Sequence, residues 1–197
     1  GRWKAQHYFA RDAYKDLLVS PIEKDNRLSV YVVSDRLTAS QGELTLSVLT
    51  LDGTVVNKIQ KKVSIAANTS KSVLSMEVDR LIKGHSKSDI VVHVCLKDKT
   101  GKIYTNNYFL LQQKDIKYPQ TVISKQMKAI DGGYEVALTS DKFARAVFMS
   151  LNGIDNFFEN NYFDILPGET VTVKVKSTLS ASDFEKQLKV VSLSDAY

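Results

Sequence analysis

Alternation of apolar and polar residues with a period of two is the feature that most limits how this chain can fold. It is clearest at 170–176, where three valines alternate with threonine and lysine, and it recurs at 28–33 and 44–48. A period of two puts successive side chains on opposite faces of a strand. Such segments therefore predict antiparallel strands with one face on a core and one face in water. The fold class we expect is all-β.

Turn signals separate the alternating segments. Asp52-Gly53 stands between 43–51 and 54–65, which predicts a hairpin with a two-residue type I′ turn. Helical signals are few: a capping box that begins at Ser182, and a single turn at 79–82. Many short strands at this spacing are typical of β-sandwiches.

The number of strand candidates predicts two sandwiches. The candidates before residue 112 begin near 17, 28, 44, 55, 72, 90 and 103, and those after residue 119 begin near 121, 134, 145, 157, 170 and 188. Between them, alternation stops and the chain reaches Pro119, which indicates a linker. The expected organisation is a leader at 1–14, a sandwich at 15–112, a linker at 113–119 and a sandwich at 120–197.

The leader has the period of a helix instead. Trp3, His7, Ala10 and Tyr14 recur at i, i+4, i+7 and i+11, which places them on one helix face. A helix this short is marginal in water. We therefore expect this face to pack against a larger body.

Charge and composition exclude several classes of function. The net charge of +5 comes mainly from scattered lysines, with Lys61-Lys62 as the only adjacent pair, so nucleic-acid binding is not expected. One cysteine cannot form an internal disulfide. No apolar run approaches the roughly 18 residues of a membrane-spanning helix, so no membrane span is expected. Motifs for a cofactor or a metal are also missing, and none is expected.

Candidates for catalysis are weak. His93 and Cys95 share one face of a strand, so a nucleophilic pair is geometrically conceivable, although a partly exposed sheet face explains both more simply. Acidic residues stand singly, so no glycosidase-type carboxylate pair can be named. The aromatic residues of 157–163 are explained by core packing, and contact with a sugar ring is the alternative.

Two segments resemble a known family. Residues 1–11, GRWKAQHYFAR, look like the stretch that ends the catalytic barrel of family 2 glycoside hydrolases of the β-mannosidase type. Residues 160–169, NNYFDILPGE, resemble a motif in the last immunoglobulin-like domain of that family. Asn160 stands where the family commonly has Asp. The residues that carry the second resemblance are Asn160, Asn161, Tyr162, Phe163, Asp164, Pro167 and Gly168.

The resemblance implies two tandem immunoglobulin-like β-sandwiches behind a short helical remnant of a catalytic barrel. Family members hydrolyse terminal β-mannosides with retention, using an acid/base glutamate and a nucleophile glutamate of the barrel. The sequence motifs that carry these two glutamates do not occur here. The expected role is therefore a non-catalytic accessory region that supports the barrel and its cleft. Its expected partners are that barrel, through the face of Trp3, His7, Ala10 and Tyr14, and β-mannoside glycans through the parent enzyme. A glycan-degrading parent favours a periplasmic or secreted location.

Two other functions fit the fold. An autonomous carbohydrate-binding module would expose coplanar aromatic rings on one sheet face. A cell-surface spacer would require only tandem sandwiches.

Overall fold

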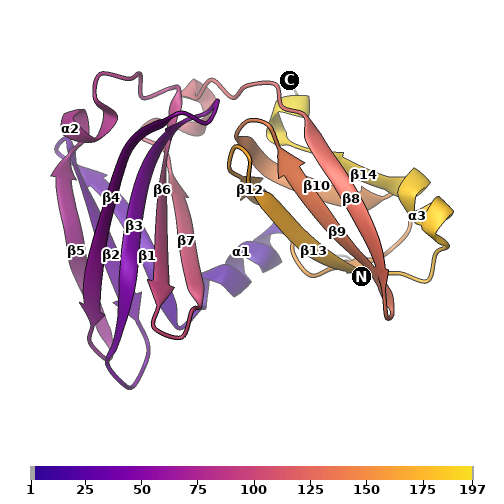
Figure 1. Ribbon diagram of the computed structural model, residues 1–197, viewed down its shortest axis with the longest axis horizontal. Helices are drawn as coiled ribbons and strands as arrows, with labels where there is room; N and C mark the ends of the chain where they lie inside the picture. Colours follow the sequence, from indigo (N-terminus) through magenta and orange to yellow (C-terminus); the bar gives the residue numbers. More distant parts are fainter. Residues whose placement is uncertain (1–2, 197) are drawn as a thin grey trace. The chain divides into compact units, whose positions relative to one another are not determined.

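The computed structural model describes residues 3–196 and, for side chains, residues 3–195. Its regular structure is mainly antiparallel β-sheet, as predicted (Figure 1). The chain divides into two compact units. One is Ala13–Lys117, and the other combines the residues up to Asp12 with those from Tyr118 onward. The first helix therefore belongs to the same unit as the second sandwich, whereas the sequence pattern treats it as a separate leader.

The unit Ala13–Lys117 is a sandwich of a three-stranded sheet, β1-β2-β5, and a four-stranded sheet, β4-β3-β6-β7. Its elements are β1 (Leu17–Lys24), β2 (Arg27–Ser34), β3 (Ser40–Thr50), β4 (Val55–Ile65), β5 (Thr69–Glu77), α2 (Val78–Ile82), β6 (Ile90–Asp98), β7 (Ile103–Tyr108) and the 3-10 helix η1 (Gln113–Asp115). The single helical turn expected at 79–82 is α2.

The core of this sandwich follows from the period of two. Leu44 of β3 lies opposite Leu96 of β6, and Leu46 lies opposite Val94. All four side chains are buried. Each cross-strand row thus points into the core, while the residues between these rows face outward.

The hairpin between β3 and β4 exists, but the prediction of a two-residue type I′ turn is wrong. Gly53 N–H donates to the Thr50 carbonyl, and Thr50 N–H donates to the Thr54 carbonyl, so the loop has three residues. Gly53 has φ +104°, whereas Asp52 is not among the residues with positive φ. A type I′ turn needs positive φ at both central residues, so a type I turn followed by a bulge at Gly53 forms instead.

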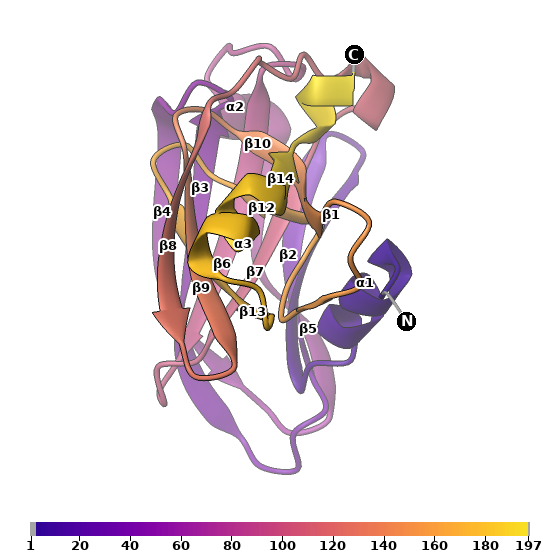
Figure 2. The same ribbon diagram turned by 90° about the vertical axis from the view of Figure 1, so that its right-hand side faces the viewer.

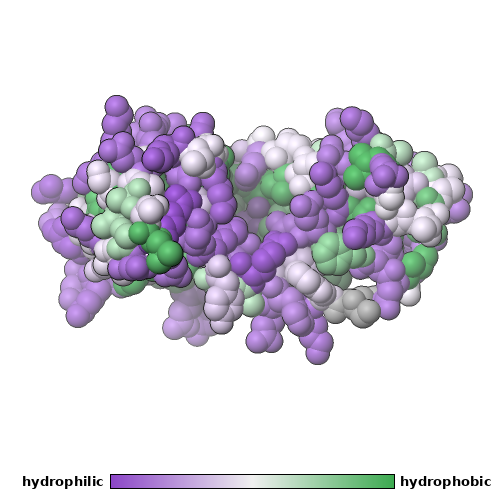
Figure 3. Space-filling model, turned by 90° about the horizontal axis from the view of Figure 1, so that it is seen from below, coloured by the Kyte–Doolittle hydropathy of each residue, from purple (hydrophilic) through white to green (hydrophobic). Residues whose placement is uncertain are grey.

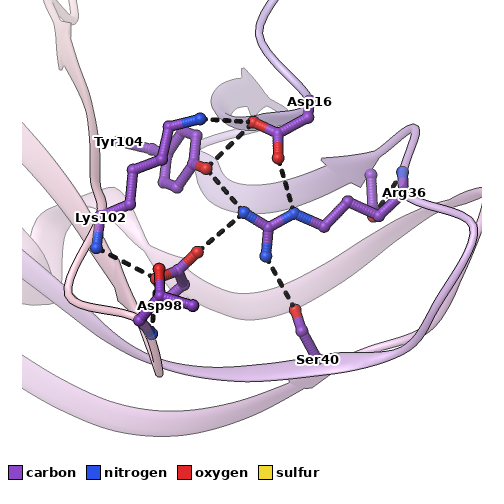
Figure 4. A network of polar contacts seen from close by, with 8 residues as sticks. Asp16, Arg36, Ser40, Asp98, Lys102 and Tyr104 are labelled. Atoms are coloured by element: carbon purple, nitrogen blue, oxygen red, sulfur yellow. Dashed lines mark hydrogen bonds and ion pairs between the residues drawn. The ribbon is translucent and has the colours of Figure 1, made fainter.

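A network of charged and polar groups closes one end of this sandwich (Figure 4). The Arg36 guanidinium donates to Asp16 and Asp98, at 2.7 Å each, and to the Tyr104 hydroxyl at 2.7 Å. Lys102 Nζ donates to Asp16 at 3.0 Å. Because Asp98 is buried, its carboxylate depends on Arg36 and on neighbouring backbone N–H groups for compensation.

The second sandwich pairs the sheets β12-β10-β14 and β11-β13-β9-β8. Its elements are β8 (Ile123–Ile130), β9 (Gly133–Ser140), β10 (Ala144–Leu151), β11 (Phe157–Phe158), β12 (Phe163–Ile165), β13 (Thr170–Lys176), α3 (Ala181–Gln187), β14 (Leu188–Val191) and the 3-10 helix η2 (Leu193–Ala196).

Helix α3 lies against this sandwich (Figure 2). Its Phe184 is fully buried and stacks on Tyr134, with ring centroids 4.1 Å apart. The helix begins earlier than predicted. Ser180, not Ser182, is the N-cap, and its hydroxyl accepts the Asp183 N–H at 3.2 Å. The helix is continuous from this cap, because the Phe184 N–H donates to the Ser180 carbonyl at 2.8 Å.

The surface is mostly polar. On the face seen in Figure 3, hydrophilic residues predominate and hydrophobic residues form small separate patches. None of the helices in the described part of the chain is long and apolar enough to cross a membrane.

Candidate functional site at the first helix

Helix α1 (Ala5–Ala13) packs on the second sandwich through one aromatic side chain. Tyr8 is the helix residue that is buried, and its hydroxyl donates to the Phe158 carbonyl at 3.1 Å. Burial raises the pKa of Tyr8, and the nearby Arg11 partly opposes this shift. The hydroxyl therefore stays protonated and remains a donor at neutral pH.

Arg11 makes the second attachment, one helical turn after Tyr8. Its guanidinium donates to the Glu159 carbonyl and, at 2.9 Å, to Asn160 Oδ1. It also lies 5.6 Å from the centre of the Tyr8 ring. Together, Tyr8 and Arg11 hold the backbone and side chains of 158–160.

Trp3 makes the third attachment, although it precedes the helix. Its ring meets Phe157 edge to face with centroids 5.5 Å apart, and it meets Tyr8 at 5.4 Å. All three attachments thus lead to the segment 157–162. The helical periodicity of the leader does not single out Tyr8 or Arg11, although both lie in the stretch 1–11 that resembles the family.

The predicted face of Trp3, His7, Ala10 and Tyr14 is not one face of α1. Trp3 precedes the helix and Tyr14 follows it with 90% exposure, so neither lies on it. At about 100° per residue, His7 and Ala10 point at least about 100° away from Tyr8. His7 is exposed and Ala10 is half-buried. The structure does bring Trp3 and His7 together, because their rings stack with centroids 5.9 Å apart, although His7 is exposed. One side of the helix thus lies on the second sandwich, and another side carries the exposed His7.

The side chain of Asn161, in the second motif, pairs with the backbone of β10 as a neighbouring strand would. Its side chain accepts the Met149 N–H at 2.8 Å and donates to the Met149 carbonyl at 2.9 Å. Asn161 is buried, so both backbone groups of β10 depend on this amide. Asn160 in turn accepts the Asn161 N–H at 3.0 Å and connects the amide to Arg11.

Tyr162 turns the chain so that its ring reaches the helix. It has φ +58°, in the left-handed region, where a non-glycine residue needs support from its surroundings. The support comes from Phe148, on which the ring stacks at 4.9 Å, and from Tyr8, at 6.0 Å. This residue thus joins β10 to α1.

Asp164 fixes an irregularity in β10. Its carboxylate accepts hydrogen bonds from the Arg145 guanidinium and, at 3.0 Å, from the N–H of Ala146. Ala146 has φ +49°, in the left-handed region. The pairing of β10 with β12 shifts register at this point, and Phe163 lies opposite Val147 after the shift. The charge of Asp164 therefore has a structural role here.

Pro167 and Gly168 form the turn that ends the motif. The Glu169 N–H donates to the Leu166 carbonyl at 2.9 Å, and Gly168 has φ +75°. Pro at the second position and a positive φ at the third are typical of a type II turn. The Glu169 carboxylate closes it by accepting the Leu166 N–H at 2.9 Å.

The pair His93 and Cys95 lies on a half-buried sheet face of the other unit. His93 Nδ1 is 2.7 Å from Asn107 Oδ1, which fixes the ring orientation, and Cys95 forms no disulfide. Within the described residues, no group of three or more His, Cys, Asp or Glu side chains could hold a metal ion. The contacts of the motif residues attach α1 and shape β10.

Comparison with known families gives two matches that together cover most of the chain. Residues 26–115 match the family model described as a mannosidase Ig/CBM-like domain. Residues 116–196 match the model of the Ig-fold domain Ig_mannosidase.

Individual relatives agree with these matches. A β-mannosidase A of Neosartorya fischeri is 26% identical over 99% of this chain, and a β-mannosidase of Capra hircus is 28% identical over 100%. The chain spans 23% of the length of each. A crystal structure of a β-D-mannosidase from Dictyoglomus thermophilum shares the fold, with a TM-score of 0.82 and 22% identity over 98% of this chain and 23% of that one.

The helix sequence, the motif that receives it and the two family matches lead to one assignment. The chain belongs to the C-terminal immunoglobulin-like domains of family 2 glycoside hydrolases of the β-mannosidase type.

Proposed function

We propose that this chain is the non-catalytic accessory region of a retaining β-mannosidase-like glycoside hydrolase. In this proposal α1 connects the last domain to the catalytic barrel. One side of the helix is attached to 157–162 through Tyr8 and Arg11, and the side with His7 packs on the barrel. The parent enzyme, and not this chain, hydrolyses terminal β-mannosides.

The observation that supports this role most strongly is the attachment of α1. A helix of nine residues is marginal by itself, and its Tyr8 hydrogen bond spans 150 residues of sequence. The segment that resembles the end of a barrel is thus held by the segment that resembles the last domain. Such an arrangement fixes the position of a helix relative to the sandwich that carries it.

The environment of the carboxylates supports the non-catalytic part of the proposal. Retaining glycosidases place two carboxyl groups about 5–5.5 Å apart, one as acid/base and one as nucleophile. The carboxylates with strong partners here are Asp16, Asp98 and Asp164, and each is bound by an arginine. Hydrogen bonds from Lys102 and Arg36 lower the pKa of Asp16, and those from Thr100 and Arg36 lower the pKa of Asp98, so neither carboxylate is suited to donate a proton at neutral pH.

The experiment is a turnover assay with an aryl β-mannoside. The purified chain and the complete product of its gene are assayed side by side at equal molar concentration. We expect hydrolysis by the complete product and none by the chain. Hydrolysis by the chain that co-elutes with it through two different chromatographic steps would refute the proposal.

The orientation of the ring planes gives less support to an autonomous carbohydrate-binding module. Trp3 and Phe157 are the aromatic pair exposed beside α1, and their planes cross at 87°. A flat platform for a polysaccharide chain requires coplanar rings. The accessory role is therefore the better supported function.

A further inference from the structure

A small cavity lies between α1 and the outer face of β10. Its volume is about 270 Å³. It is bounded by Trp3 and Tyr8 from the helix side and by Phe148 and Tyr162 from the sandwich side. All of these residues belong to one compact unit.

The walls combine aromatic rings with polar groups that lack protein partners. In the part of the chain that the structure describes, the hydroxyls of Ser150 and Tyr162 and the ammonium of Lys4 bond to no protein group. Asn156 uses its Nδ2 to donate to the Ile154 carbonyl at 3.1 Å, which leaves Oδ1 as an acceptor. The cavity therefore offers both donors and an acceptor beside ring surfaces.

This combination matches one class of ligand. A pyranose has an apolar C–H face that packs on aromatic rings, and hydroxyls around its edge that both donate and accept. The volume of about 270 Å³ lies just below the roughly 300–1,000 Å³ that is usual for ligand cavities, so the cavity has room for one ring and not for a chain of rings. A purely apolar ligand would displace water from the half-buried hydroxyls of Ser150 and Tyr162 without replacing its hydrogen bonds, at a cost in free energy.

We propose that the cavity between α1 and β10 binds a single neutral hexopyranose unit. The ring packs between Trp3 and Tyr162, and its hydroxyls bond to Tyr162, Ser150, Asn156 and Lys4. This site is separate from hydrolysis and does not depend on the proposed accessory function, which rests on the contacts of Tyr8 and Arg11.

The test uses the fluorescence of Trp3, the only tryptophan of the chain. The purified chain is titrated with methyl β-D-mannopyranoside and methyl β-D-glucopyranoside, and cyclohexanol serves as an apolar ring without the hydroxyl pattern. We expect a saturable change in emission with at least one of the two glycosides, with a dissociation constant in the range of about 1–10 mM. Cyclohexanol should give no saturable change at the same concentrations.

Two matched variants assign the binding to the cavity. Tyr162→Phe keeps the ring that stacks on Phe148 and removes only the hydroxyl, so we expect about fivefold weaker binding. Tyr31→Phe makes the same change on β2 of the other unit and should bind like the original chain. The melting temperature of both variants verifies that each is folded.

Two results would overturn this proposal. One is the absence of any saturable change with both glycosides up to about 100 mM, a concentration well above the expected dissociation constant. The other is a glycoside response that Tyr162→Phe leaves unaltered while the variant is folded. Either result leaves the accessory function open to its own assay, because that assay measures hydrolysis.

Discussion

At the scale of single residues, the motif of the last domain is explained by backbone groups of β10 that take their partners from its side chains. Asn161 satisfies both backbone groups of Met149, and Asp164 satisfies the N–H of Ala146 in its left-handed conformation. Buried backbone groups without partners are rare and costly. These side chains are therefore constrained by the backbone that they complete.

Replacing Asn161 tests this interpretation. Asn161→Ala removes the partner of a buried N–H and of a buried carbonyl, so we expect a loss of roughly 2–4 kcal/mol in the free energy of unfolding. Asn152→Ala, at an exposed turn, should change it by less than about 0.5 kcal/mol. Urea denaturation followed by circular dichroism measures both. Equal stabilities of the two variants would disprove the role of the amide.

The Arg36 network makes a prediction about pH. Hydrogen bonds from Lys102 and Arg36 hold the pKa of Asp16 well below its usual value, and those from Thr100 and Arg36 do the same for Asp98. A lowered folded-state pKa stabilises the fold above the ordinary Asp value of about 3.9, and the stabilisation is lost as the pH falls below it. We therefore expect the free energy of unfolding to decrease as the pH falls below about 4.

The variant Asp98→Asn isolates this contribution. Asparagine does not titrate, so the variant should be less stable at neutral pH, and its stability should depend less on pH in the acidic range. Denaturation curves at a series of pH values measure both effects. A variant with the same acid dependence as the original chain would assign that dependence to other carboxylates.

At the scale of elements, tight approaches of backbone decide where glycine is required. A Cβ at Gly133 would lie 2.0 Å from the Val175 carbonyl oxygen, whereas at Gly132 nothing lies within 4 Å. Gly132 has φ +73°, so alanine there costs about 1–2 kcal/mol by conformation alone.

The adjacent pair gives a matched test. Gly133→Ala must push β9 away from β13, so we expect a larger loss of stability than the roughly 1–2 kcal/mol of Gly132→Ala. Urea denaturation of both variants measures the difference. An equal loss in both would mean that the two strands separate at this end without cost.

Helix α1 gives a prediction at the same scale. Tyr8→Phe keeps the buried ring and leaves the Phe158 carbonyl without its donor, so we expect a loss of about 1–2 kcal/mol in stability of this unit. Gln6→Ala, on an exposed position of the same helix, serves as the control. Hydrogen exchange of the α1 amides should become faster in Tyr8→Phe only. Unchanged exchange would show that the helix is held by other contacts.

Sequence patterns predicted the strands better than the turns, and the turns better than the site. The period of two locates β3 and β6 because burial alternates along each strand. The loop at Asp52-Gly53 depends on the sign of one φ angle, which the dipeptide does not determine. The contact of Tyr8 with Phe158 spans 150 residues, so no local pattern contains it. The likeness of both segments to one family did not predict this contact either, because it assigned the helix to the catalytic barrel.

At the scale of the whole molecule, each unit has its own hydrophobic core, and α1 is attached to the second one. The proposed accessory role adds a partner for the other side of the helix. That partner, the catalytic barrel, would then be coupled to the last sandwich through a single helix. The coupling predicts that changes on the free side of α1 affect the enzyme but not the isolated chain.

The most direct measurement of this account compares His7→Glu with Gln6→Glu. The two positions are adjacent and exposed, and both changes place a glutamate on α1. They point about 100° apart around the helix, with His7 on the proposed barrel side. For the complete gene product, the measurement is the rate at which heating abolishes its β-mannoside hydrolysis activity. For the isolated chain, it is the melting temperature.

The account predicts that His7→Glu accelerates inactivation of the complete enzyme severalfold, while Gln6→Glu does not. It also predicts that the melting temperature of the isolated chain changes little in either variant, because the ring partner of His7 there is the exposed Trp3. Equal inactivation rates for His7→Glu, Gln6→Glu and the original enzyme would contradict the role of α1 as the connection to the barrel.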